Sequence, residues 1–144
     1  MLLGFRGGVL SARGISVLVA DDQENMRVLF SKVLQSLGYT CDVAVDGRDC
    51  LTLVSQKRYD IVFVDLVMPE IDGEIILRWL TSHHPDTSVV VVSVQDDEGI
   101  IKQLLSLGAT AYLVKPFSSH EIQNVMRGVE NRRTSAGLSL VGAG

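Results

Sequence analysis

Five short apolar runs alternate along this chain with five segments that have helical character. The runs are rich in β-branched residues and bounded by turn residues, which is typical of strands buried on both faces of a sheet. They span Ile15–Ala20, Cys41–Val45, Ile61–Asp65, Thr87–Val92 and Ala111–Val114. Strands that alternate with helices form a parallel sheet covered by helices on both sides. The pattern therefore predicts one α/β domain, which 144 residues are enough to build.

The segments between the runs carry helix start and stop signals. In the first, apolar residues recur from Met26 to Leu37 at i, i+3, i+4, i+7, i+8 and i+11, which predicts one broad apolar face. Gly38 is well placed to end this helix. Ser118 followed by Glu121 predicts a capping box at the start of the last helix. Arg132 and Arg133 suit the end of that helix by charge.

Composition narrows the class of protein. The formal net charge of −4 gives no reason to expect binding to nucleic acid or to an anionic membrane. The two cysteines, Cys41 and Cys50, lack metal-ligand spacing and cannot form a disulfide framework, so we interpret them as reduced thiols of a cytosolic protein. No apolar run is long enough to span a bilayer. Residues 1–14 lack the apolar centre of a secretory signal.

Polar side chains stand at the carboxyl ends of four of the predicted strands. They are Asp21, Asp22, Asp65, Ser93 and Lys115. The carboxyl ends of parallel strands lie at the same edge of a sheet, where ligands collect. We therefore expect these residues, which are far apart in the sequence, to meet in one shallow pocket.

Clustered carboxylates need a partner. Two unit charges about 4 Å apart interact by roughly 4 kcal/mol at an effective dielectric constant near 20, so the cluster favours a cation or a proton. Carboxylates combined with a phosphate oxygen are typical of Mg²⁺, and Asp65–Gly73 lacks the alternating acids of a calcium loop. One carboxylate could then attack a phosphoryl group, with Lys115 and Ser93 contacting its oxygens.

Each of these residues also has a simpler interpretation. Asp21 and Asp22 could cap the first helix, and Asp65 could merely begin a turn. Taken alone, Ser93 is an ordinary strand-end hydroxyl and Lys115 a solvated charge. Their combination in this order and at this spacing favours the functional interpretation.

From residue 15 to residue 133 the chain resembles the receiver domain of two-component response regulators. The resemblance implies a flavodoxin-like, five-stranded parallel sheet with strand order 2-1-3-4-5. Residues 1–14 would then be an N-terminal extension, and residues 134–144 a flexible tail or linker. The residues that carry the resemblance are Asp21-Asp22, Asp65, Met68-Pro69, Asp72-Gly73, Ser93, Gly108-Ala109 and Tyr112–Phe117.

The resemblance implies a role for each acid. Asp65 would accept a phosphoryl group from a phosphohistidine of a sensor kinase. Asp22 and Asp65 would ligate Mg²⁺, and Asp21 would act largely through a bound water. The backbone carbonyl of Val67 would be a further ligand.

The resemblance also implies a switch. Lys115 would pair with the phosphoryl group, and its peptide bond to Pro116 is expected to be cis. On phosphorylation the Ser93 hydroxyl would move to a phosphoryl oxygen, and Tyr112 would turn inward into the vacated space. The face made by the fourth helix, the fifth strand and the last helix would change as one population replaces another.

The implied partners follow from this role. They are a sensor histidine kinase or phosphotransfer protein, and a downstream effector or output domain outside this chain. A homodimer could form through the face of the fourth helix, fifth strand and last helix. Such a protein would be cytoplasmic, would catalyse only its own phosphorylation and dephosphorylation, and would bind neither nucleic acid nor membrane directly.

The residues leave two alternative functions to consider, a phosphatase and a docking module. An Asp-nucleophile phosphatase typically has a second acid two residues after the nucleophile, where this chain has Val67. A docking module that works without phosphorylation would not need the acids, Ser93 and Lys115. Val94 is bulkier than the residue often found there in receivers, so we expect slow gain or loss of the phosphoryl group.

Overall fold

The computed structural model describes residues 14–135 as a five-stranded parallel sheet with helices on both faces. The strands are β1 (Ser16–Ala20), β2 (Thr40–Ala44), β3 (Ile61–Asp65), β4 (Ser88–Ser93) and β5 (Ala111–Val114). They lie in the order β2-β1-β3-β4-β5. This flavodoxin-like arrangement confirms the predicted fold and strand order.

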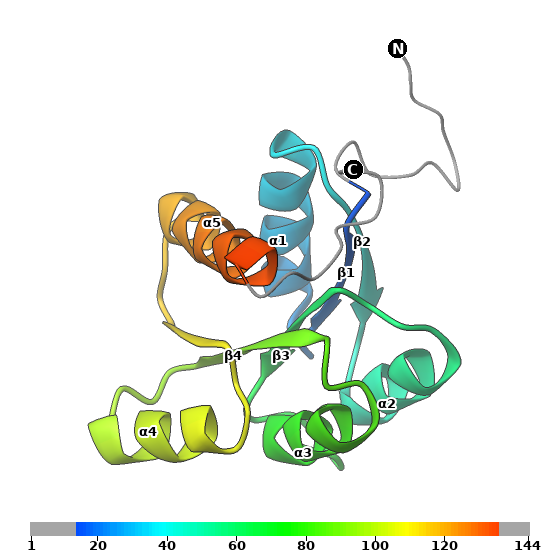
Figure 1. Ribbon diagram of the computed structural model, residues 1–144, viewed down its shortest axis with the longest axis vertical. Helices are drawn as coiled ribbons and strands as arrows, with labels where there is room; N and C mark the ends of the chain where they lie inside the picture. Colours follow the sequence, from blue (N-terminus) through cyan, green and yellow to red (C-terminus); the bar gives the residue numbers. More distant parts are fainter. Residues whose placement is uncertain (1–13, 136–144) are drawn as a thin grey trace.

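Two groups of helices cover the sheet (Figure 1). The helices α2 (Gly47–Gln56), α3 (Gly73–His83) and α4 (Glu98–Ser106) lie on one face. The helices α1 (Glu24–Ser36) and α5 (Ser119–Ser135) lie on the other. The strands are buried on both faces because alternate residues point to opposite layers. In β3, for example, Val62 and Val64 pack with the first group, whereas Ile61 and Phe63 pack with the second.

Most of the predicted element boundaries agree with the structure to within two residues. Gly38 and Gly108 have φ angles of 91° and 115° directly after α1 and α4, a conformation that glycine adopts at little cost. The capping box at α5 is present, because the Ser118 amide donates to Glu121 Oε1 and the Glu121 amide to Ser118 Oγ. Helix α5 continues to Ser135, past the predicted boundary at residue 133.

Arg132 and Arg133 lie in the last turn of α5, which confirms the prediction for both. The burial of Arg133 was not predicted: the residue is only 4% exposed, and its guanidinium bonds to Asp60, which directly precedes β3. Cys41 in β2 and Cys50 in α2 are free thiols. Burial, above all, raises the pKa of both, and that of Cys50 to about 12, so neither is an activated thiol. Within residues 14–135, no helix has the length and apolar content needed to cross a bilayer.

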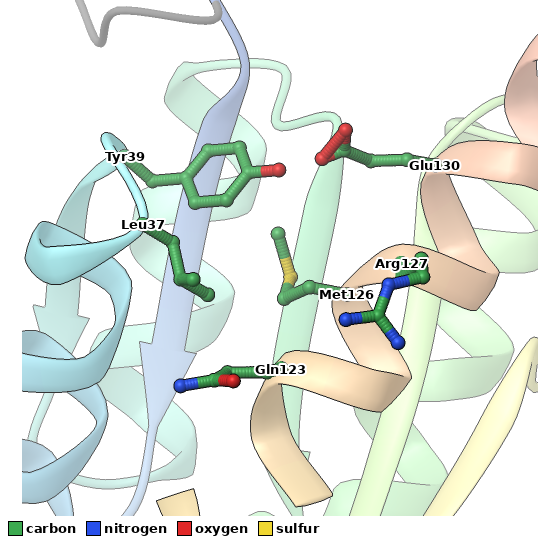
Figure 2. A pocket seen from close by; sticks show the side chains of 6 residues that line it. All are labelled: Leu37, Tyr39, Gln123, Met126, Arg127 and Glu130. Atoms are coloured by element: carbon green, nitrogen blue, oxygen red, sulfur yellow. The ribbon is translucent and has the colours of Figure 1, made fainter. Parts of the chain in front are cut away.

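A surface pocket of about 210 Å³ lies between the end of α1 and the middle of α5. Figure 2 shows Leu37 and Tyr39 on one side and four α5 side chains opposite them. Because α1 runs from the carboxyl edge of the sheet back to the other edge, this pocket lies away from the strand ends that carry the acids. None of the predicted site residues lines it. It therefore plays no part in the site described next.

Candidate functional site

The predicted polar residues meet at the carboxyl edge of the sheet. Asp21, Asp22 and Asp65 each offer a carboxylate oxygen, and these oxygens lie within 4.8 Å of one another. Lys115 Nζ lies 3.2 Å from Asp21 Oδ2 and 3.2 Å from Asp65 Oδ2. Ser93, the remaining predicted site residue, is the last residue of β4.

Strand register accounts for this convergence. Ala20 of β1 pairs with Val64 of β3, so the next residues, Asp21 and Asp65, leave neighbouring strands at the same height. Asp65 in turn pairs with Val92 of β4, which puts Ser93 one residue further along. The Lys115 amide donates to Ser93 O at 2.7 Å, so the chain after β5 stays tied to β4. The Lys115–Pro116 peptide bond is cis, as expected.

Asp21 is held by three hydrogen bonds besides its ion pair. Its amide donates to Ala44 O, its carbonyl accepts from Arg27 Nη1 at 2.8 Å, and its Oδ1 accepts from the Gln23 amide at 2.9 Å. The other carboxylate oxygen, Oδ2, is buried and lies 3.2 Å from the Lys115 ammonium. Three carboxylates that share one ammonium leave negative charge in excess, and their oxygens fit a hard cation such as Mg²⁺.

Arg27 is a site residue that the sequence interpretation missed. It lies one turn into α1, and its guanidinium contacts the backbone of Asp21 instead of any of the three carboxylates. The carboxylates are thus left for other partners. The available signal was its position, five residues after the Asp22 that precedes the helix.

Burial and neighbouring charges shift the ionisation of the two central groups. Asp65 is 6% exposed, and burial together with the Asp21 carboxylate raises its pKa, a shift that the Lys115 ammonium partly offsets. Burial alone would lower the pKa of Lys115, but Asp65 and Asp21 outweigh it and raise that pKa. The lysine therefore keeps a fixed positive charge at the site.

Ser93 and Tyr112 bond to the backbone of the same residue. Ser93 is 1% exposed, and its Oγ accepts the Gln95 amide at 3.1 Å. The Tyr112 hydroxyl donates to Gln95 O at 2.9 Å. Gln95 thus joins the two residues for which a switch role is expected.

Two exposed valines flank the acids. Val67 is 63% exposed and Val94 is 70% exposed. The Val67 amide donates to Asp65 Oδ1 at 3.2 Å, which orients that carboxylate. A ligand role for the Val67 carbonyl stays a prediction.

The loop between β3 and α3 is shaped by close backbone contacts. A Cβ on Gly73 would lie 2.4 Å from Asp65 O, so only glycine fits there. Glu70 has a φ of 69° and forms an ion pair with Arg48 of α2. Asp72 caps α3 by accepting the Ile75 amide. These contacts set the path of the chain immediately after Asp65.

Comparison with known proteins agrees with this geometry. The sequence model of the family described as response regulator receiver domain matches residues 17–127. The chain is 34% identical over 120 residues to the response regulator MprA of Mycolicibacterium vanbaalenii, covering 83% of this chain and 52% of that protein. The chain thus spans about half the length of that relative.

Solved structures show the same fold. The receiver domain of the Francisella response regulator 1452 aligns with a TM-score of 0.77 and 30% identity, covering 82% of this chain and 98% of that one. A CheX–CheY–BeF₃–Mg²⁺ complex from Borrelia burgdorferi contains a chain that aligns with a TM-score of 0.75 and 27% identity, covering 78% of this chain and 87% of that one.

Proposed function

The chain belongs to the response regulator receiver domain family, and from this premise we propose that it is a Mg²⁺-dependent switch that accepts a phosphoryl group on Asp65. One observation carries the proposal. The Asp65 carboxylate lies 3.2 Å from the Lys115 ammonium, and one of its oxygens lies within 4.8 Å of carboxylate oxygens of Asp21 and Asp22. A phosphoryl acceptor needs both a positive charge for the transferred oxygens and a place for a cation.

The transfer itself is a displacement at phosphorus. A carboxylate oxygen of Asp65 forms the new O–P bond while the N–P bond of the donor phosphohistidine breaks, and the electron pair stays on the imidazole nitrogen. The Val67 amide holds Oδ1 in place during this step, and Lys115 contacts the phosphoryl oxygens.

The acids would hold the cation. Asp22 and Asp65 would be direct ligands, Asp21 would act largely through a water, and the Val67 carbonyl would complete the protein's share. Bound Mg²⁺ would supply positive charge that offsets the carboxylates and the developing charge on the phosphoryl oxygens. The carboxylate oxygens of the three acids, which lie within 4.8 Å of one another, support this assignment.

The response follows from the Gln95 contacts. When the Ser93 hydroxyl turns to a phosphoryl oxygen, the Gln95 amide loses its acceptor and the loop before α4 can rearrange. Tyr112, which holds the carbonyl of the same residue, then changes its packing on β5. The altered face consists of α4, β5 and α5.

This role implies a setting for the chain. We infer that residues 15–133 form the receiver, together with Thr134 and Ser135, which complete α5. Apart from residues 14, 134 and 135, the predicted extension (residues 1–14) and the predicted tail or linker (residues 134–144) lie outside the described residues. The donor would be a sensor histidine kinase or a phosphotransfer protein, and this chain would accept the phosphoryl group in the cytoplasm. The output would be an effector or a further domain, and dimerisation could use the α4–β5–α5 face.

Mass spectrometry of the intact protein tests the proposal. Incubation with Mg²⁺ and acetyl phosphate should add one phosphoryl group to the wild type and none to Asp65→Asn. Asp72→Asn is a matched control, because it changes a nearby capping carboxylate and should still be phosphorylated. If Asp65→Asn still gained one phosphoryl group, the assignment of Asp65 as the acceptor would be wrong.

A rival function would give a different result. An Asp-nucleophile hydrolase would turn over external phosphate esters repeatedly, but the position of its second acid is Val67 here. A docking module would show no added mass under any condition. The same incubation, with released phosphate measured in parallel, separates the three functions.

A further inference from the structure

Arg133 lies in the last turn of α5, carries a buried charge and takes no part in the switch proposed above. It is 4% exposed, and its side chain reaches from the helix to the amino-terminal edge of the sheet. This edge lies opposite the acids. The hydrogen bonds that the Arg133 guanidinium makes at this edge indicate a role in fixing the end of α5 to the sheet.

The guanidinium bonds to two strand entries at once. Nη1 lies 3.0 Å from Asp60 O, 2.7 Å from Asp86 O and 3.3 Å from Ser88 Oγ. Nη2 donates to Asp60 Oδ1 at 3.0 Å. Asp60 directly precedes β3, and Ser88 begins β4. A planar fork of this kind suits arginine and cannot be reproduced by the single ammonium of lysine.

Asp60 extends the connection to a third strand. Its Oδ2 accepts the Ser16 amide at 2.9 Å, and its own amide donates to Ser16 O at 2.9 Å. The Ser88 amide donates to Asp60 O at 2.9 Å. The end of α5 is thereby tied, through one ion pair, to the entries of β1, β3 and β4.

The rest of α5 is attached differently. Its first half is held by the apolar contacts of Ile122 and Met126 and starts at the exposed capping box of Ser118. Gly128 separates the two halves, and a Cβ there would touch nothing within 4 Å. The second half has one buried apolar residue, Val129, and is held in addition by the contacts of Arg133, so the two halves of the helix can move unevenly.

We propose that Arg133 is a positioning residue that clamps the last turn of α5 to the base of the sheet, so that switching moves the first half of α5 and leaves its end fixed. The part of this inference that concerns switching depends on the proposed function, whereas the clamp itself does not. A partner that distinguishes the two states would then contact α4, β5 and the first half of α5. The last two turns, from Val129 to Ser135, would look the same in both states.

Hydrogen exchange of the full chain, followed by mass spectrometry, tests both parts. Without any activator, Arg133→Met should raise amide exchange over residues 129–135 by roughly 10-fold or more, because the turn loses its ion pair with Asp60 and keeps the bond from Arg132 to Thr110 O. Arg127→Met is the matched control, since Arg127 is exposed and bonds only to Asn124 of the same helix. It should leave this exchange unchanged.

Beryllium fluoride with Mg²⁺, used as a phosphoryl mimic, tests the second part. In the wild type it should change exchange over residues 119–127 and leave residues 129–135 unchanged, whereas in Arg133→Met both halves should respond. If Arg133→Met does not fold, Arg133→Lys, which keeps the charge without the fork, should show the same effects at smaller amplitude.

Three results have distinct meanings. Unchanged exchange over residues 129–135 in both Arg133 variants would overturn the clamp. An equal response of both halves of α5 in the wild type would overturn the fixed end. A wild type that shows no response to the mimic anywhere would contradict the proposed function, while the comparison without activator would still decide the clamp.

Discussion

Ser93 and Tyr112 are linked through the two backbone groups of one residue, Gln95. Ser93 Oγ accepts its amide at 3.1 Å, and the Tyr112 hydroxyl donates to its carbonyl at 2.9 Å. The two side chains come from adjacent strands, β4 and β5. A change in either side chain therefore acts on the same short stretch of backbone.

The first prediction concerns this link. Ser93→Ala should raise the exchange rate of the Gln95 amide by roughly 2- to 10-fold, since a net hydrogen bond contributes about 0.5–1.5 kcal/mol. Tyr112→Phe should raise it less, because it frees only the carbonyl. In the double variant the two effects should not add, since neighbours that share a partner are coupled. Strict additivity in exchange measured by NMR would argue against the link.

The pH dependence of stability should reveal Asp65. Because its pKa is raised in the folded chain, the folded state binds the proton more tightly than the unfolded state does, and unfolding releases it. The Asp65 carboxyl therefore lowers stability as the pH rises above the ordinary carboxyl range. Asp65→Asn should raise the Tm by roughly 2–5 °C at pH 7, with a smaller difference near pH 4. A lower Tm for Asp65→Asn at pH 7, measured by calorimetry without Mg²⁺, would contradict this sign.

Arg27 should position the cation site even though it is itself a cation. Coulomb's law alone predicts that Arg27→Met tightens Mg²⁺ binding, because a positive charge is removed from beside the acids. Loss of the bond to the Asp21 carbonyl predicts the opposite, and we expect a roughly 10-fold weaker affinity by titration calorimetry. Arg78→Met, which removes an exposed arginine paired with Glu74 on α3, should change the affinity little. Tighter binding by Arg27→Met would mean that charge dominates.

Val94 should limit access to Asp65. Val94 directly follows Ser93, and it is 70% exposed. We expect Val94→Ala to speed both the gain and the loss of the phosphoryl group by about threefold, or ~0.7 kcal/mol of barrier. Leu105→Ala, an exposed apolar truncation on α4, serves as the control. Equal rates for Val94→Ala and the wild type in single-turnover measurements would remove this role.

Two glycines should respond in opposite directions to the same substitution. Gly128→Ala should stabilise the protein by about 0.5–1 kcal/mol, because the new Cβ meets nothing and alanine favours a helix. Gly47→Ala should cost more than about 2 kcal/mol, because its Cβ would lie 1.7 Å from Ile71 O. Urea unfolding of both variants measures the two effects. A stable Gly47→Ala would mean that the loop after β3 relaxes easily.

Much of the fold and of the acid site could be predicted because these features are encoded locally. Buried strands and amphipathic helices follow from the period of apolar residues, and glycines end α1 and α4 where a positive φ is needed. The meeting of Asp21 with Asp65 follows from topology, since parallel strands share one carboxyl edge. No contact between particular side chains had to be known for these predictions.

The tertiary structure alone decided which polar groups meet across elements. Arg132 and Arg133 are adjacent and chemically identical, yet one is exposed and the other is buried against the entries of β3 and β4. Helix rotation and the depth at which α5 packs on the sheet determine that difference, and neither is a property of a local pattern. The same holds for Arg27 on the Asp21 carbonyl and for Gln95 between Ser93 and Tyr112. Periodicity specifies which face of a helix is buried, whereas the partner of each polar group depends on distances that exist only once the layers have packed.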